Sequence, residues 1–98
     1  MEELIDRIIE VSKTKEGKTA SQLLLKLMEE SGEVAEALLS YEKACGCEYK
    51  NKSMDDVGEE AVDVLLVILA FMTRIGMSKD QIKSMIETKL AKWQKVIG

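Results

Sequence analysis

The chain of 98 residues contains no histidine and no proline, and aromatic residues make up only 4% of it. The absence of histidine excludes Ser-His and Cys-His catalytic pairs and every metal site that requires imidazole. The absence of proline, together with only six glycines, favours long uninterrupted helices over a turn-rich β fold. Hydrophobic residues make up 46%, which excludes global disorder and leaves aliphatic side chains to fill the core.

The chain also lacks an excess of basic charge and a long hydrophobic run. There are 14 basic and 18 acidic residues, for a net charge of −4, which argues against nucleic-acid binding. The longest apolar run, residues 64–72, is about half of the ~20 residues that a membrane-spanning helix needs, so we expect no membrane association. A chain of this length accommodates one domain, and we expect residues 1–98 to form it.

The two cysteines, Cys45 and Cys47, are separated by a single glycine. A disulfide between them would close a small, strained ring, and two cysteines without histidine do not complete a tetrahedral zinc site. The pattern differs from the disulfide framework of a secreted protein, and the first residues lack the basic and apolar regions of a signal peptide. We therefore expect a cytoplasmic, reducing environment.

Apolar periodicity predicts an all-α fold with four helices, at about residues 2–13, 19–44, 53–75 and 78–97. The second helix should pack against other helices through one stripe, which comprises Leu24, Leu27, Ser31, Val34, Leu38 and Tyr41. Two serines precede a matching acid or amide by three residues, which is an N-cap signature; the pairs are Ser53 with Asp56 and Ser78 with Gln81. Gly76 is expected to stop the third helix.

Between residues 61 and 72 the third helix is apolar on nearly every face except at Asp63. A helix of this kind must be covered on all sides, and three other short helices of one chain scarcely suffice. We therefore expect an oligomeric helical bundle. An ionised carboxylate at Asp63 would need compensation by a lysine, an arginine or a metal ion, or else by a hydrogen bond to the backbone.

Two pairs of acids have a spacing that places both members on one side of a helix: Glu30 with Glu33, and Glu60 with Asp63. Taken alone, the acids of the second helix also fit a solvated face. Two carboxylate pairs without histidine fit a hard cation such as Mg²⁺ or Mn²⁺. Because Mg²⁺ usually keeps positions open for substrate phosphates, the residues favour a metal-dependent phosphoryl hydrolase.

The strings KLMEESGEVAEAL at residues 26–38 and EEAVDVL at residues 59–65 resemble the MazG-type all-α nucleoside triphosphate pyrophosphohydrolases. The hallmark of that family is an E-x-x-E pair followed, after a gap, by an E-x-x-D pair. The resemblance implies that Mg²⁺ on the substrate's triphosphate is coordinated by four residues, Glu30, Glu33, Glu60 and Asp63. Water would then attack at the α–β linkage, releasing a nucleoside monophosphate and pyrophosphate.

The resemblance also implies roles for residues around these acids. Lys26 is expected to touch a phosphate or to brace Glu30. Our own assignment, beyond the resemblance, is that Glu29 or Glu59 orients the attacking water or supports the metal ligands. Lys89 and Lys92 in the last helix are expected to bind phosphates, although lysines there also fit the dipole of a helix C-terminus. Members of the family form dimers or tetramers with sites near chain interfaces, which agrees with the apolar third helix.

The resemblance favours deoxyribonucleoside triphosphates as substrates and a house-cleaning role in the nucleotide pool. Two alternatives stay open. One is a phosphoribosyl-ATP pyrophosphohydrolase, although the histidine expected after the second acid pair is missing. The other is a non-catalytic helical interaction module, in which the acids are surface residues. A di-iron carboxylate bundle is excluded because its Glu-x-x-His motifs require histidine.

Overall fold

The computed structural model describes residues 2–42 and 53–97, and they form four helices with no strand among them. The helices are α1 (Glu2–Lys15), α2 (Ala20–Tyr41), α3 (Met54–Arg74) and α4 (Lys79–Ile97). The prediction of an all-α fold is confirmed, and the bounds of α3 and α4 agree closely with the sequence pattern. The predicted loop at residues 45–52, with both cysteines, lies outside the described residues.

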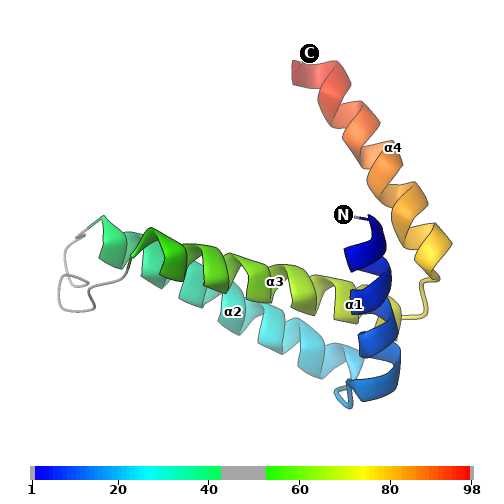
Figure 1. The fold of residues 1–98 in the computed structure, drawn as a ribbon, viewed down its shortest axis with the longest axis horizontal. Helices are drawn as coiled ribbons and strands as arrows, with labels where there is room; N and C mark the ends of the chain where they lie inside the picture. The colour runs from blue at the N-terminus through cyan, green and yellow to red at the C-terminus, as the bar shows by residue number, and fades with distance from the viewer. Residues whose placement is uncertain (1, 43–52, 98) are drawn as a thin grey trace.

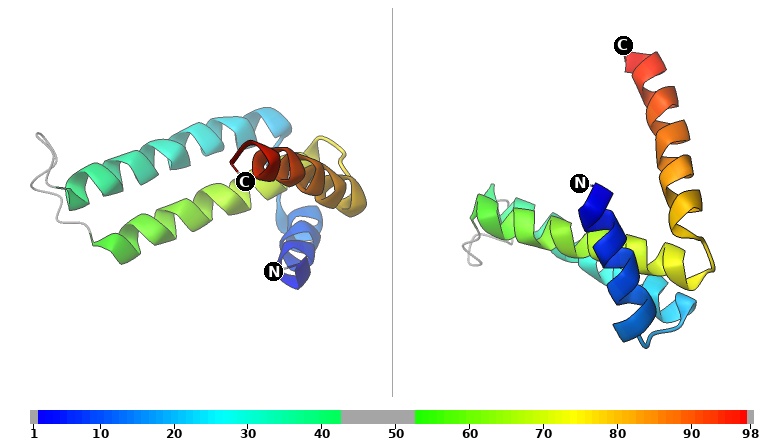
Figure 2. Two further views of the ribbon diagram at one scale, coloured as in Figure 1. Left: turned by 90° about the horizontal axis from the view of Figure 1, so that it is seen from above. Right: turned by 45° about the vertical axis from the view of Figure 1, so that its right-hand side comes forward.

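The helices α2 and α3 run antiparallel as a long hairpin, and α1 crosses the C-terminal half of α3 (Figure 1). Helix α4 leaves the end of α3 and projects away from the hairpin, as Figure 1 and the right view of Figure 2 show. Within one chain, α2 therefore covers α3 along its length, and α1 covers α3 near the C-terminal end of α3. Within the part of the chain that the structure describes, no helix is long and apolar enough to cross a membrane.

Local hydrogen bonds explain where three of the helices begin. Ser53 and Asp56 form a reciprocal capping box at the start of α3, as their spacing predicted. Ser78 and Gln81 do the same before α4, where the Ser78 N–H donates to the Gln81 side chain at 2.7 Å. A third box, which the sequence analysis did not single out, joins Thr19 to Gln22 at the start of α2.

Gly76 ends α3, as predicted. It has a φ of +96°, a left-handed conformation that side chains other than glycine's rarely adopt. The Gly76 N–H donates to the Thr73 carbonyl and the Met77 N–H to the Met72 carbonyl, both at 3.1 Å. These bonds satisfy carbonyls at the helix end and let the chain turn into α4.

A small core joins three helices where α1 crosses α3 and α4 begins. It consists of Ile9 of α1, Leu69 of α3 and Ile82 of α4, and Met72 and Met77 pack against it. These two methionines thus help to fill the core. Three others are exposed in the single chain: Met28, Met54 and Met85.

The predicted packing stripe of α2 is only partly correct. Leu27 and Val34 are half-buried, whereas Leu24, Leu38 and Tyr41 are exposed. The buried positions of α2 are instead Leu23, Glu30, Ala37 and Ser40. The buried face is rotated toward these residues because α3 covers only one side of α2, and the sequence pattern alone does not indicate which side that is.

Two side chains show how the relative placement of helices decides contacts. The guanidinium of Arg74 in α3 donates to the backbone carbonyl of Glu16 in the α1–α2 connection. Trp93 of α4 lies outside the core of the single chain, where its side chain is 63% exposed. Local sequence encodes neither of these placements.

Candidate metal centre

The four acids of the two predicted pairs come together in the middle of the α2–α3 hairpin. The antiparallel packing of the helices brings Glu30 of α2 beside Glu60 and Asp63 of α3, with one carboxylate oxygen of each lying within 4.8 Å of the others. A second group, whose carboxylate oxygens also lie within 4.8 Å of one another, consists of Glu29, Glu30 and Glu33. Glu30 belongs to both groups and is therefore the centre of the cluster.

Burial distinguishes this cluster from a solvated helix face. Glu30 is only 6% exposed, and Glu60 is half-buried. Among the described residues, no donor group reaches the buried Oε2 atom of either side chain. Buried carboxylate oxygens are costly without a positive or hydrogen-bonding partner, so these two atoms fit a bound cation.

Lys26 forms an ion pair with one of the two carboxylate oxygens of Glu30. Its ammonium lies 2.9 Å from Glu30 Oε1 and 3.4 Å from Glu29 Oε1, reaching both from one turn earlier in α2. The bond from Lys26 lowers the pKa of the Glu30 carboxyl below its usual value, and the same contacts raise the pKa of Lys26. Lys26 therefore braces Glu30, which was one of its two expected roles.

Glu33 adds a third carboxylate to the space between Glu30 and Glu60. Hydrogen bonding with Glu30 and then with Glu60, together with their negative charges, raises the pKa of Glu33 to about 7. The crowding of negative charge around Glu33 therefore favours a bound proton there near neutral pH. A divalent cation among these acids would compensate the same charge and compete with that proton.

The exposure of the Asp63 side chain differs from the prediction. The apolar sequence around it predicted a buried carboxylate, but Asp63 is exposed in the single chain. The reason is that α2 and α1 cover one side of α3 and leave other apolar positions, including Val62, Leu65 and Leu66, exposed as well. A cation held by Glu30, Glu60 and Asp63 would thus have one side open, as binding of a substrate phosphate requires.

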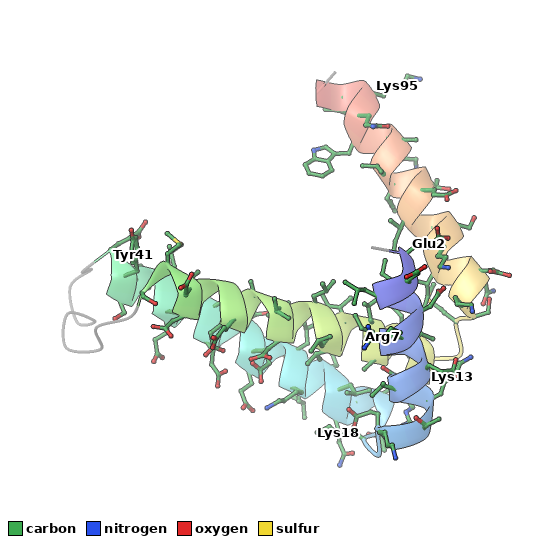
Figure 3. The ribbon with its side chains drawn as sticks, in the orientation of Figure 1. Glu2, Arg7, Lys13, Lys18, Tyr41 and Lys95 are labelled. Carbon is green, nitrogen blue, oxygen red and sulfur yellow. The ribbon has the colours of Figure 1, made fainter. Side chains whose placement is uncertain are left out.

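The remaining predicted site residues are not all brought to this cluster. Glu29 joins it, whereas Glu59 is exposed and belongs to neither compact group. Lys89 and Lys92 are exposed on α4, the helix that projects away from the hairpin (Figure 1). Lys95, further along the same helix, lies at its far end (Figure 3). The chain by itself does not place these lysines beside the acids.

A groove that the sequence analysis did not anticipate lies between α1 and α3, with a volume of about 420 Å³. Most of its lining is apolar, and Arg7 of α1, labelled in Figure 3, also lines it. The helical spacing of Leu4, Ile8 and Val11 was the signal that α1 presents an apolar face. The groove begins on α3 at Leu66, about one turn after Asp63.

Comparison with known proteins agrees with this geometry. No curated protein and no solved structure gave a significant match to the chain. The model of the MazG nucleotide pyrophosphohydrolase domain matches residues 18–96, which include both acid pairs and the hairpin that joins them. With most of its length matched, the chain belongs to the MazG nucleotide pyrophosphohydrolase domain family.

Proposed function

We propose that the protein is a Mg²⁺-dependent nucleoside triphosphate pyrophosphohydrolase that releases a nucleoside monophosphate and pyrophosphate. The observation that carries this proposal is that the buried Oε2 atoms of Glu30 and Glu60 have no partner in the described part of the chain, although both residues belong to a compact group of carboxylates. Oxygen ligands without histidine suit Mg²⁺, with Mn²⁺ as a substitute. The family match supports a pyrophosphohydrolase, and removal of surplus or noncanonical nucleotides is the role we propose for it.

In this proposal Glu30, Glu60 and Asp63 hold the metal, and Glu33 completes the set of four ligands from the α2 side. When bound, a divalent cation there would neutralise phosphate oxygens and favour ionisation of an attacking water. Glu29, which lies at the cluster and is exposed, is the better placed of the two candidate bases to accept the proton from that water. Glu59 stays a second candidate, for orienting the water from the α3 side.

The proposed enzyme is a homodimer or homotetramer. Large apolar side chains are exposed along α2, α3 and α4, among them Leu25, Met28, Val62 and Leu65. Burying such side chains against a second copy would remove them from water. Assembly would also give Lys89 and Lys92 of one copy a route to the phosphates held at another, since α4 projects away from the acids of its own chain.

The decisive experiment measures pyrophosphate release from ribo-, deoxyribo- and modified nucleoside triphosphates, with phosphoribosyl-ATP in the panel, with and without Mg²⁺. We expect Mg²⁺-dependent release that falls by about 100-fold or more in Asp63→Asn and in Glu33→Gln, because each removes a ligand charge. Glu10→Gln, an exposed acid on α1, is the matched control and should keep full activity.

The same panel separates the alternatives. Release from phosphoribosyl-ATP alone would assign the chain to that narrower reaction. No pyrophosphate release from any nucleotide, together with no change in the thermal midpoint on addition of Mg²⁺ or Mn²⁺, would favour the interaction module. The thermal midpoint is informative because a cation that binds only the folded chain must stabilise it. Full activity of Asp63→Asn would contradict the ligand assignment.

Oligomerisation is tested by size-exclusion chromatography with light scattering. We expect a mass of two or four chains for the wild type. Leu25→Glu and Met28→Glu should shift it toward the monomer, because each places a charge on an apolar face that is more than half exposed in one chain. A monomeric wild type at micromolar concentration would overturn this part of the proposal.

A further inference from the structure

The acid cluster has two halves that share Glu30. The outer half consists of Glu29, Glu30 and Glu33, all from α2, and the inner half of Glu30, Glu60 and Asp63, which spans α2 and α3. In each half the oxygens of the three acids lie within 4.8 Å of one another, so by distance alone either half could hold a cation.

A side chain of the protein already supplies positive charge to the outer half. The Lys26 ammonium lies 2.9 Å from Glu30 Oε1 and 3.4 Å from Glu29 Oε1, so it contacts two of the three outer acids. It reaches them from the preceding turns of the same helix, at the i,i+3 and i,i+4 spacings that place side chains side by side.

The inner half has no such cation among the described residues. Glu30 is more than nine-tenths buried, and no donor in residues 2–42 and 53–97 reaches its second oxygen, Oε2, or Oε2 of Glu60. The two oxygens of Glu30 thus differ: Oε1 is bound by Lys26, and Oε2 is left for the inner half.

We propose that the Lys26 ammonium acts as the resident cation of the outer half, so that without substrate the chain binds one divalent ion, in the inner half. The inference rests on the proposed function, because it takes the inner half to be the metal site. A divalent ion in the outer half would have to displace an ammonium that is tethered to the same helix and bonded to two of its ligands. Repulsion between the two cations opposes their sharing Glu29 and Glu30.

The test is the stoichiometry of Mn²⁺ binding to the nucleotide-free protein, measured from the electron paramagnetic resonance signal of free Mn²⁺. We expect one ion per chain in the wild type and two in Lys26→Met, because removal of the ammonium opens the outer half. Lys26→Arg, which keeps the positive charge, should retain one ion. Lys18→Met, which removes an ion-paired lysine outside the cluster, is the matched control and should also retain one.

Second variants assign each ion to its half. Glu29→Gln combined with Lys26→Met should return the count to one, since it removes an outer acid. Asp63→Asn combined with Lys26→Met should also leave one ion, now in the outer half. Lys26→Gln repeats the measurement with a polar side chain, and circular dichroism checks that each variant stays helical.

Two ions per chain in the wild type would overturn the inference, as would a single ion in both Lys26→Met and Lys26→Gln with helix content unchanged. Failure of the proposed function gives a different result, because a wild type whose inner half binds no metal binds no ion at all. In that case Lys26→Met could still bind a single ion in the outer half. Loss of this ion on adding Glu29→Gln would support the role of Lys26. No ion in either protein would overturn both.

Discussion

The ammonium of Lys83 lies 2.7 Å from Oδ1 of Asp6, and this ion pair joins the beginning of α4 to α1. Lys83 also lies 3.2 Å from the Glu2 carboxylate. Next to it Ile82 enters the small core with Ile9, so one polar and one apolar contact fix the place where α4 leaves the body of the chain. Beyond this point the large apolar side chains of α4 up to Val96 are exposed in the single chain.

The Asp6–Lys83 pair predicts a specific dependence of stability on pH. The bond from Lys83 holds the pKa of Asp6 below its ordinary value of 3.8, and the bond to Asp6 raises the pKa of Lys83 above 10.5. The stabilisation from Asp6 is therefore fully present above pH 3.8 and is lost as the pH falls through the lowered pKa. That from Lys83 is present below pH 10.5 and is lost as the pH rises through the raised pKa.

We expect Asp6→Asn to have a lower thermal midpoint than the wild type by a small, constant amount between about pH 5 and 9. The difference should shrink as the pH falls below 3.8 and through the lowered pKa of Asp6, where the carboxylate of the folded wild type also becomes neutral. Melting curves of both proteins across this range check the prediction. A difference that persists unchanged at pH 2 would show that the aspartate acts through something other than its charge.

Ile82→Ala should be the most destabilising truncation in α4. Ile82 is completely buried, so its truncation leaves a cavity beside Ile9 and Leu69 and should cost about 2–5 kcal/mol of unfolding free energy. Ile86→Ala, one turn further on and 42% exposed, is the matched control and should cost clearly less. Urea unfolding at a fixed protein concentration measures both. Equal losses would mean that a second copy buries Ile86 as deeply as the chain buries Ile82.

Two glycine-to-alanine substitutions should act in opposite directions. Gly76→Ala should destabilise by about 1 kcal/mol, because the φ of +96° is unfavourable for alanine although no atom lies within 4 Å of the added Cβ. Gly58→Ala, in the helical part of α3 and equally open, should stabilise by about 0.5–1 kcal/mol through higher helix propensity. Denaturant unfolding gives both values. The same sign for both variants would contradict the conformational explanation.

Local sequence determined most of the secondary structure. The capping boxes at Ser53 and Ser78 depend on residues three apart, and the stop at Gly76 depends on one residue without a Cβ, so neither needs information from distant parts of the chain. The i,i+3 spacing likewise determined that Glu30 and Glu33 share one side of α2. The family resemblance rested on the same strings.

Tertiary structure decided which of these residues meet and which are buried. The register of the α2–α3 hairpin places Glu60 and Asp63 of α3 beside Glu30 of α2. The exposure of Asp63 and the rotation of the buried face of α2 depend on how α1, α2 and α3 pack against one another, which helical periodicity does not contain. Periodicity records that a face is apolar; whether that face is covered, and by which helix, depends on contacts between residues far apart in the chain.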